Sequence, residues 1–599
     1  MRTGGAADFA AFRAGMKILL GGSETANANA AATLYTIASV TADEIVLSGT
    51  PGLSDETGVT VDVDQFVELA SVQIQLREDF DIIANNGLTA KAGGESFIGT
   101  EQTLALNLVD VDGNLRIRAQ GDITNLLGTS GTNIQSDDLL LESGDGGIGG
   151  AGRIYIDQTS GSGLTARGGG AISITERNGN MNVATIFSRS DIDLVAQGSI
   201  LDYIGTDFVN IQGDSLFLTA QTGSIGTTAD ALEIEATDDG PEAKGLLTAT
   251  AVGDIVITEQ FGDMNIRNVL STAGNVVLEA AVSMFDAVDL IDPTAPASSA
   301  EAATGTAQLA ADVLAHGDVT LTARLGFIGA FGNDLDIDSR RSGSAGLVTT
   351  QSAENTYLIE QAGDMWLNSV GVDPTDAMTT AYLTATVGGI FNGAPVGASN
   401  VSGGRAYLIA QSDIGTALKP VFTEIGTIQT LSTTGSTYVT NDGALEVAVL
   451  DSPAGYGQES GGAVETTASS PITVANDVLA AGNITLTATE SAPEDYDTIT
   501  VNSGISVVSS AGDIAFRSGD HIVVAIGALV DAELGNVAFT SDFGDIGSGG
   551  GDITVDGTVN AAQQISLTSG ADSDLLTITG LVTAGGSLNL QTNDGDDTV

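Results

Sequence analysis

Short apolar–polar–apolar stretches, each introduced by Gly and then Asp or Asn, recur along most of the chain. Examples are GDIVIT, GDVTLTA, GNITLTA, GDIAF and GDITV, which begin at residues 253, 317, 482, 512 and 551. An alternation of period two predicts a short strand with one buried face, and the Thr, Val and Ile that fill it favour a pleated surface. Gly and Asp or Asn predict a turn before each strand, because both residue types tolerate positive φ. The pattern therefore predicts several dozen short strands separated by turns.

Longer phrases also repeat. ITERNGNMNV (174–183) returns as ITEQFGDMNI (257–266) and as LIEQAGDMWL (358–367), and GSIGTTADALEIEA (223–236) matches GFIGAFGNDLDID (326–338). No convincing amphipathic helix separates the strands, which excludes a sheet built from alternating strands and helices. A β-sandwich needs only about seven to nine strands. Stacked coils absorb many more, because each coil pairs its strand edges with the next, and we predict a parallel β-solenoid.

The distribution of Gly-Asp turns and of Pro-, Gly- and Ser-rich stretches along the chain predicts how it divides into domains. Residues 1–63, with longer strands and less Gly-Asp, are predicted to form a small β module or a cap over the first coil. Residues 64–450 are predicted to be solenoid, with a loop excursion near 283–317 whose Ala-rich part could form a short helix. The Gly/Ser/Pro-rich residues 451–471 are interpreted as a loop or a junction. Residues 472–599 continue the solenoid and stop in what resembles the middle of a repeat, so we expect a fragment of a longer chain.

Composition narrows the possible partners. Hydrophobic residues make up 42% of the 599, which is enough to fold despite 78 Gly. Asp and Glu number 77 against 19 Lys and Arg, for a net charge of −58. Nucleic acid and anionic lipid would be repelled by such a chain. Cys is absent, so disulfides and thiolate chemistry are excluded. No apolar run reaches about 18 residues, so we predict no membrane insertion, in either a cytosolic protein or an internal piece of an exported one.

These phrases resemble a known class of proteins. The Gly-Asp/Asn phrases, the GSIG and GFIG phrases and the strand endings in LTA are similar to giant repetitive surface proteins and adhesins of bacteria, including the filamentous-haemagglutinin type. The resemblance covers roughly Asp64 to Val599. It implies a right-handed parallel β-helix, export, a rod-like stalk and attachment to surfaces or other cells. From the sequence we expect no signal sequence, secretion-recognition domain or membrane anchor within these residues, which would be a departure from that class.

Two features of the sequence are candidates for ligand binding. GDGGIG (144–149) fits the dinucleotide pattern, but the fingerprint must open a helix, and GRIYIDQT (152–159) is predicted to be a strand; we interpret it as a glycine-rich turn and predict no cofactor. Turn aspartates could bind calcium, yet the tandem repeat that supplies several oxygens to one ion is missing. We expect these side chains to bond their own backbone, with calcium left possible and the metal site unknown. They are Asp254, Asp263, Asp318, Asp364, Asp513 and Asp552.

An enzyme is the first alternative. Parallel β-helices include polysaccharide lyases and hydrolases, which would need a cleft of carboxylates with a base such as Arg340 or Arg341. The two histidines, His316 and His521, are far apart and predicted to lie at coil edges or in loops, and Trp366 is predicted to pack in a loop. We therefore predict no catalytic residues.

The function predicted from the sequence is a non-enzymatic structural and adhesive rod at the cell surface, part of a large exported bacterial protein. Its expected partners are a host or neighbouring-cell surface, extracellular polysaccharide and the rest of its own longer chain. Besides the polysaccharide-degrading enzyme, a calcium-stabilised surface-layer or matrix protein remains an alternative.

Overall fold

The fold consists of β-strands. The computed structural model describes residues 17–21, 35–41, 44–48, 62–66, 79–150, 152–205, 207–236, 245–287, 311–341, 344–450, 455–490, 497–544, 550–570, 573–593 and 597–599. Every regular element in these ranges is a strand, and none of these ranges contains a helix long and apolar enough to cross a membrane. The chain divides into two compact units. The first comprises residues 1–172, 181–187 and 202–211, and the second comprises 173–180, 188–201 and 212–599.

The N-terminal strands form a separate antiparallel sheet. Its order is β3-β2-β1-β4, made of β1 (Lys17–Gly21), β2 (Tyr35–Thr41), β3 (Glu44–Leu47) and β4 (Asp62–Phe66). Strand β4 pairs with β1 along its whole length, so the predicted boundary at residue 63 is wrong by a few residues. The alternation in VDVDQF is the same as in a solenoid strand, and periodicity alone could not assign it. The first described solenoid strand is β5 (Phe80–Asp81), and the cap role stays a prediction.

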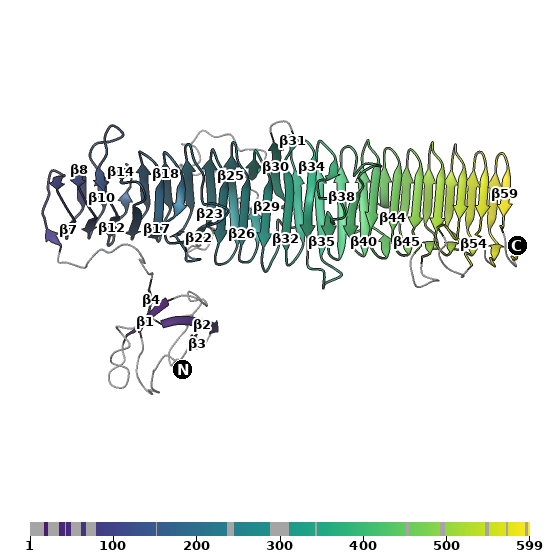
Figure 1. The fold of residues 1–599 in the computed structure, drawn as a ribbon, viewed down its shortest axis with the longest axis horizontal. Coiled ribbons are helices and arrows are strands. Elements are labelled where there is room, and N and C mark those ends of the chain that lie inside the picture. The colour runs from purple at the N-terminus through teal and green to yellow at the C-terminus, as the bar shows by residue number, and fades with distance from the viewer. Residues whose placement is uncertain are drawn as a thin grey trace. The chain divides into compact units, whose positions relative to one another are not determined.

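The rest of the described chain is a parallel β-solenoid of about 19 turns, as predicted. Two long parallel sheets run through it, and Figure 1 shows the coils of the second unit stacked in a row from teal to yellow. Towards the C-terminus each coil has three strands. The last four coils are β48 (Ile499–Val501), β49 (Ser506–Ser509) and β50 (Ile514–Ser518); β51 (Ile522–Val524), β52 (Leu529–Ala532) and β53 (Val537–Thr540); β54 (Ile553–Val555), β55 (Thr558–Ala561) and β56 (Ile565–Thr568); and β57 (Leu576–Ile578), β58 (Leu581–Ala584) and β59 (Leu588–Gln591).

Equivalent positions stack in register and fill one layer of the core. Ile499, Ile522, Ile553 and Leu576 pair in succession at the start of these coils. In the neighbouring sheet, Phe516 and Phe539 are fully buried, with ring centroids 4.8 Å apart and planes at 4°. The apolar triplet therefore repeats because each coil must place the same kind of side chain over the one before it.

Of the predicted loop or junction at 451–471, residues 455–471 continue the solenoid instead, and residues 451–454 lie outside the described residues. Strands β43 (Tyr456–Ser460) and β44 (Val464–Ala468) continue both sheets, pairing with the coils before and after them. Some of their inward positions are polar, which weakens the alternation in the sequence: Gln458 and Thr466 are fully buried and hydrogen-bond each other at 3.0 and 3.1 Å.

The excursion predicted near 283–317 is bounded by sheet strands. Residues 284–286 and 313–315 form β27 and β28, both within a solenoid sheet. Residues 288–310, and with them the predicted short helix, lie outside the described residues.

Glycine serves two different purposes in the turns. Gly179, Gly262 and Gly363, from the three copies of the longer phrase, have φ of 105°, 85° and 87°, and a Cβ there would meet nothing within 4 Å. Gly274 instead has no positive φ, and a Cβ on it would lie 2.5 Å from the backbone N of Asp254 in the preceding coil. The same holds for Gly512 against Asn483. The expectation of positive φ is therefore confirmed at Gly179, Gly262 and Gly363 and wrong at Gly274 and Gly512, where glycine permits close approach of coils.

Candidate functional site: the turn carboxylates and the surfaces near them

The six turn aspartates singled out in the sequence link one coil to the next. Oδ1 of each accepts a backbone N–H from the following coil, at 2.7 to 3.1 Å. The expectation that they bond their own local backbone is therefore wrong. The acceptors Asp254, Asp263, Asp318, Asp364, Asp513 and Asp552 take the N–H of Asn275, Ser283, Leu347, Gly389, Asn536 and Leu575, respectively.

Two runs of these links continue over four coils. In one, the side chains of Asp254, Asn275 and Asp318 each accept the next coil's N–H; in the other, those of Asn483, Asp513 and Asn536 do the same. In the first run a neutral amide separates two carboxylates, and in the second run two amides flank one carboxylate. Coils in a parallel sheet are about 4.8 Å apart, and carboxylates on adjacent coils would repel each other at that spacing. The alternation keeps the hydrogen bonds and lowers the repulsion.

No metal site is apparent among these turns. In the part of the chain that the structure describes, no three His, Asp or Glu side chains gather in a way that could hold a metal ion. The calcium hypothesis stays a prediction.

A buried glutamate, missed in the sequence, lies in each copy of the longer phrase. Glu176, Glu259 and Glu360 are at most 1% exposed. The Glu360 carboxylate accepts the hydroxyl of Ser339 at 2.7 Å and the N–H groups of Ser339 and Ala362 at 3.2 and 3.3 Å. Burial raises the pKa of Glu360 to about 7, and it raises the pKa of Glu259 well above its ordinary value. The sequence does carry a signal for this glutamate, because Glu stands at the same position in all three copies of the phrase.

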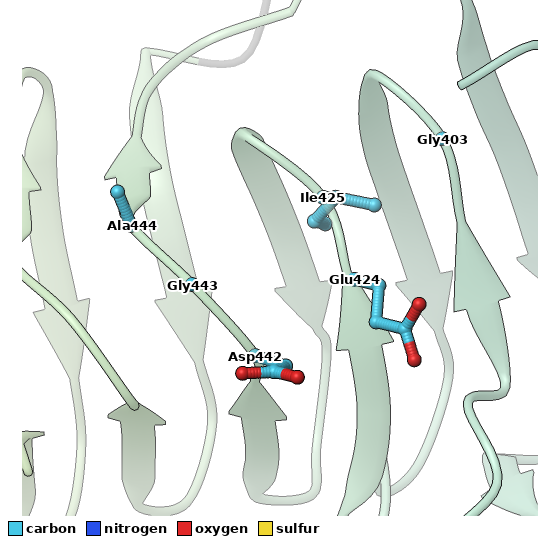
Figure 2. Close-up of a pocket in the computed structure, with 6 residues that line it drawn as sticks. All are labelled: Gly403, Glu424, Ile425, Asp442, Gly443 and Ala444. Atoms are coloured by element: carbon cyan, nitrogen blue, oxygen red, sulfur yellow. The ribbon is translucent and has the colours of Figure 1, made fainter. Parts of the chain in front are cut away.

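A surface depression of about 480 Å³ lies between successive coils. Figure 2 shows its six lining residues, with the carboxylates of Glu424 and Asp442 on neighbouring coils. Glu424 ends β39 (Val421–Glu424), and Asp442 follows β41 (Thr437–Asn441). Asp442 accepts the hydroxyl of Ser469 at 2.7 Å. None of the six lining residues is Lys, Arg or His, so this pair has no cationic partner within the depression.

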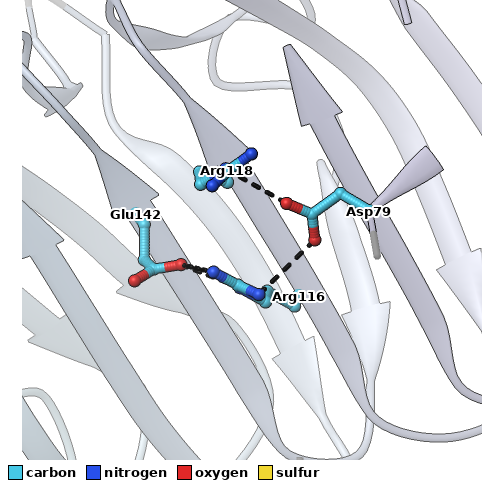
Figure 3. Close-up of polar contacts among 4 residues, drawn as sticks. All are labelled: Asp79, Arg116, Arg118 and Glu142. Atoms are coloured by element: carbon cyan, nitrogen blue, oxygen red, sulfur yellow. Dashed lines mark hydrogen bonds and ion pairs between the residues drawn. The ribbon is translucent and has the colours of Figure 1, made fainter. Parts of the chain in front are cut away.

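An ion-pair network ties together the first coils of the first unit (Figure 3). On β9 (Leu115–Ala119), Arg116 Nη2 lies 2.7 Å from Glu142 Oε2 and its Nη1 lies 3.5 Å from Asp79 Oδ1. Arg118 Nε lies 3.0 Å from the other oxygen of Asp79. The Asp79 side chain lies close to Gly99 of the intervening strand β7 (Ser96–Thr100). A Cβ added to Gly99 would lie 2.8 Å from the Asp79 Cβ, so a larger residue there would displace Asp79. The network is a structural clamp across coils.

The histidines and the tryptophan take structural positions. His521 Nδ1 accepts the N–H of Asp552 at 3.0 Å, and the N–H of His316 donates to the Ser271 carbonyl at 3.2 Å, so each lies at a coil edge as predicted. Trp366 lies on strand β34 (Met365–Gly371), which corrects the prediction of a loop, and its ring is 5.2 Å from that of Phe391.

The remaining motifs also belong to strands. GDGGIG runs into β13 (Ile148–Gly149) and then β14 (Ile154–Gln158), so the strand predicted after it is confirmed. Arg340 and Arg341 end β30 (Leu335–Arg341), which turns back onto β31 (Ser344–Ala345). Their side chains lie outside the described residues.

Comparison with known proteins adds no family. The chain matches no protein-family model, and neither curated proteins nor solved structures gave a match. What the residues and the fold support together is a β-solenoid whose turns are specialised for holding coils together.

Proposed function

We propose that this chain is a non-enzymatic structural rod, a spacer segment of a large exported bacterial surface protein that mediates attachment. The observation that carries the proposal is the repeated coil-to-coil bonding among the described coils. Strand pairing places the same positions over one another, and the turn side chains add a further hydrogen bond per coil outside the strands. A stack of this kind resists bending and separates what is attached to its ends.

Export and attachment rest on the character of the sequence. The Gly-Asp phrases resemble those of bacterial surface adhesins, and a chain without Cys needs no oxidative folding after export. The charge of −58 makes neighbouring rods repel one another, which suits a densely covered surface. The proposed partners are a host or neighbouring-cell surface, extracellular polysaccharide and the rest of a longer chain.

Small-angle scattering of the purified full chain tests the rod. We expect a scattering curve with a linear cross-section region, as an elongated particle gives; a curve typical of a compact globule would overturn the proposal.

Attachment needs a separate experiment. Beads coated with the chain are expected to be retained on bacterial or host cells, or on immobilised polysaccharide, more than beads coated with an unrelated protein of equal negative charge. Equal retention of the two kinds of bead would refute the proposed adhesion and leave only the proposed role as a structural rod. Release of new chain ends from polysaccharide in the same samples would replace the proposal with the enzyme alternative.

A further inference from the structure

Four corners of the solenoid share one plan. Each has a short strand that ends in Asn or Asp, a connection, and a second buried Asn or Asp just before the next short strand. Both short strands pair with a single long strand of the preceding coil. The corner pairs are Asn125 and Asn133, between β10 (Ile123–Asn125) and β11 (Ile134–Ser136); Asp202 and Asn210, between β19 (Ile200–Asp202) and β20 (Ile211–Gly213); Asp286 and Asp312, between β27 (Met284–Asp286) and β28 (Val313–Ala315); and Asn392 and Asn400, between β36 (Ile390–Asn392) and β37 (Val401–Ser402).

The backbone of the second member is held in the same way at every corner. Its carbonyl accepts an N–H from the preceding coil at 2.7 to 2.8 Å in all four. Its own N–H donates to a carbonyl of the following coil at residues 133, 312 and 400, at 2.7 to 2.9 Å. The four side chains therefore occupy equivalent positions.

Three corners place an asparagine there and use both hydrogens of its amide. Nδ2 of Asn133, Asn210 and Asn400 donates to the side-chain oxygen of its corner partner, at 2.8, 2.6 and 3.1 Å. It also donates to a backbone carbonyl of the preceding coil, at 3.1, 3.4 and 2.7 Å. The amide oxygens of Asn133 and Asn400 accept an N–H from the following coil at 3.0 and 2.9 Å.

The remaining corner has Asp312 where the others have asparagine. Asp312 is 7% exposed and Asp286 is 4% exposed. One Asp312 oxygen accepts the N–H of Asp336 at 3.1 Å, as the amide oxygen does elsewhere. On the shared plan, its other oxygen takes the place of the amide nitrogen and meets the carboxyl of Asp286, to which it is hydrogen-bonded. Two carboxylates offer acceptors only, so that bond requires a proton.

We propose that Asp286 and Asp312 share one proton, that this proton holds the corner between β27 and β28 closed as the asparagine amide does at the other three, and that its loss in alkaline solution loosens this coil. The corner is thus a pH-sensitive contact between coils, whereas the other three corners are held by an asparagine amide.

The electrostatic surroundings favour the shared proton. Burial, and then the charge of Asp286, raise the pKa of Asp312 to about 8. Asp336 adds negative charge from β30, which also carries Asp338. On the preceding strand β25 (Met264–Ser271), Arg267 follows Ile266, the residue paired with Asp286, and is the cation nearest along that strand. Glu279 of β26 (Val276–Ala280) is ion-paired with Arg324. Because the folded pKa exceeds the ordinary 3.8, the stabilisation is complete below about pH 4 and is lost as pH rises through about 8.

Amide hydrogen exchange of the full chain tests the proposal. Protection at residues 284–287 and 311–315, corrected for intrinsic rates, is expected to fall up to about tenfold per pH unit above about pH 8. Protection at the corner of Asn392 and Asn400, in the same sample, is expected to stay constant. Equal behaviour of the two corners up to about pH 9.5 would overturn the proposal.

Matched variants separate the proton from other causes. Asp312→Asn restores the plan of the other corners and is expected to keep protection at neutral pH while removing its pH dependence; Asp286→Asn, a second route to an amide–acid pair, is expected to do the same. Asn210→Asp, which places a second carboxyl against that of Asp202, should give that corner the same pH dependence. Dependence that persists in both Asp312→Asn and Asp286→Asn would refute the shared proton. Added Ca²⁺ is expected to leave the exchange protection of this corner unchanged. If Ca²⁺ restored protection in alkaline solution, the shared-proton proposal would be refuted in favour of a cation site.

Discussion

Replacing Gly274 by Ala tests whether glycine in the Gly-Asp/Asn turns is required by close approach. Its φ is not positive, so Ala meets no backbone strain at this position. The added Cβ would instead lie 2.5 Å from the N of Asp254 and from the carbonyl carbon of Gly253, against about 3.4 Å for an ordinary contact. The two coils must therefore separate locally by about 0.9 Å.

That separation gives the expected magnitude. Two hydrogen bonds cross this point: the N–H of Asn275 donates to Asp254 Oδ1 at 2.8 Å, and the N–H of Ile255 donates to the Asn275 carbonyl at 2.9 Å. Both would stretch beyond 3.5 Å, which costs about 1 kcal/mol each. With about 1 kcal/mol for overpacking, the local free energy of opening should fall by about 3 kcal/mol.

Hydrogen exchange at the amides of 255–259 and 275–280 measures this loss directly, as a rise in exchange rate of about 100-fold. Gly262 provides the control, since its φ is 85° and a Cβ there meets nothing within 4 Å. Gly262→Ala should cost only about 1 to 2 kcal/mol, and Gly262→Asn should recover most of it, because Asn tolerates that conformation. At position 274 Asn should be no better than Ala. Rescue of position 274 by Asn, or an unchanged exchange rate in Gly274→Ala, would refute the close-approach argument.

Three further predictions concern other contacts. Asp318→Ala leaves the half-buried N–H of Leu347 without its acceptor and should cost about 1 kcal/mol, seen as faster exchange of that amide, whereas Asp318→Asn should be nearly neutral; equal loss in both variants would contradict the link. Glu360→Gln should raise the melting temperature above pH 7 and leave it nearly unchanged near pH 4, because the rise of the Glu360 pKa from 4.5 to about 7 corresponds to about 3 kcal/mol that is lost as pH increases through that interval; an unaltered pH profile would argue against burial of the charge. Deleting residues 499–521 removes one whole coil and brings Ile522 into register with Ile472, so strand content by circular dichroism should persist, whereas a deletion of half that length should unfold the neighbouring coils; tolerance of both deletions would contradict the register.

Strands with apolar inward positions could be predicted from the sequence, and those with polar ones could not. GDIVIT and GNITLTA show their period directly because Ile and Leu face inward at β24 (Ile255–Glu259) and β47 (Ile484–Ala488). Residues 456–468 have the same geometry, but Gln458 and Thr466 satisfy each other inside the core. A hydropathy pattern reveals buried apolar side chains, but it does not reveal two buried polar side chains that hydrogen-bond each other.

The partners of the turn side chains could not be predicted either, because the donor lies in another coil at a variable distance along the chain. Asp254 and its donor are 21 residues apart, and Asp318 and its donor are 29 apart. A third copy of the Ile-Gly turn was missed for a related reason. Gly415 has φ of 67°, and a bridge between Thr416 and Lys419 closes the turn, as in the copies at Gly226 and Gly329, yet only Ile-Gly is common to the three sequences.

The buried carboxyls and the surface charge act on stability in the same direction. Glu259, Glu360 and Asp312 all have raised pKa values, chiefly through burial, so each contributes more to folding when protonated. The net charge of −58 adds repulsion between coils that also weakens as acid protonates the exposed carboxylates. Proteins commonly lose stability in acid because their buried carboxylates are ionised and paired. Here Glu259 and Glu360 accept backbone N–H groups, and Glu360 also accepts the hydroxyl of Ser339, so the coils around these carboxyls should become more stable as pH falls from about 9 towards about 5.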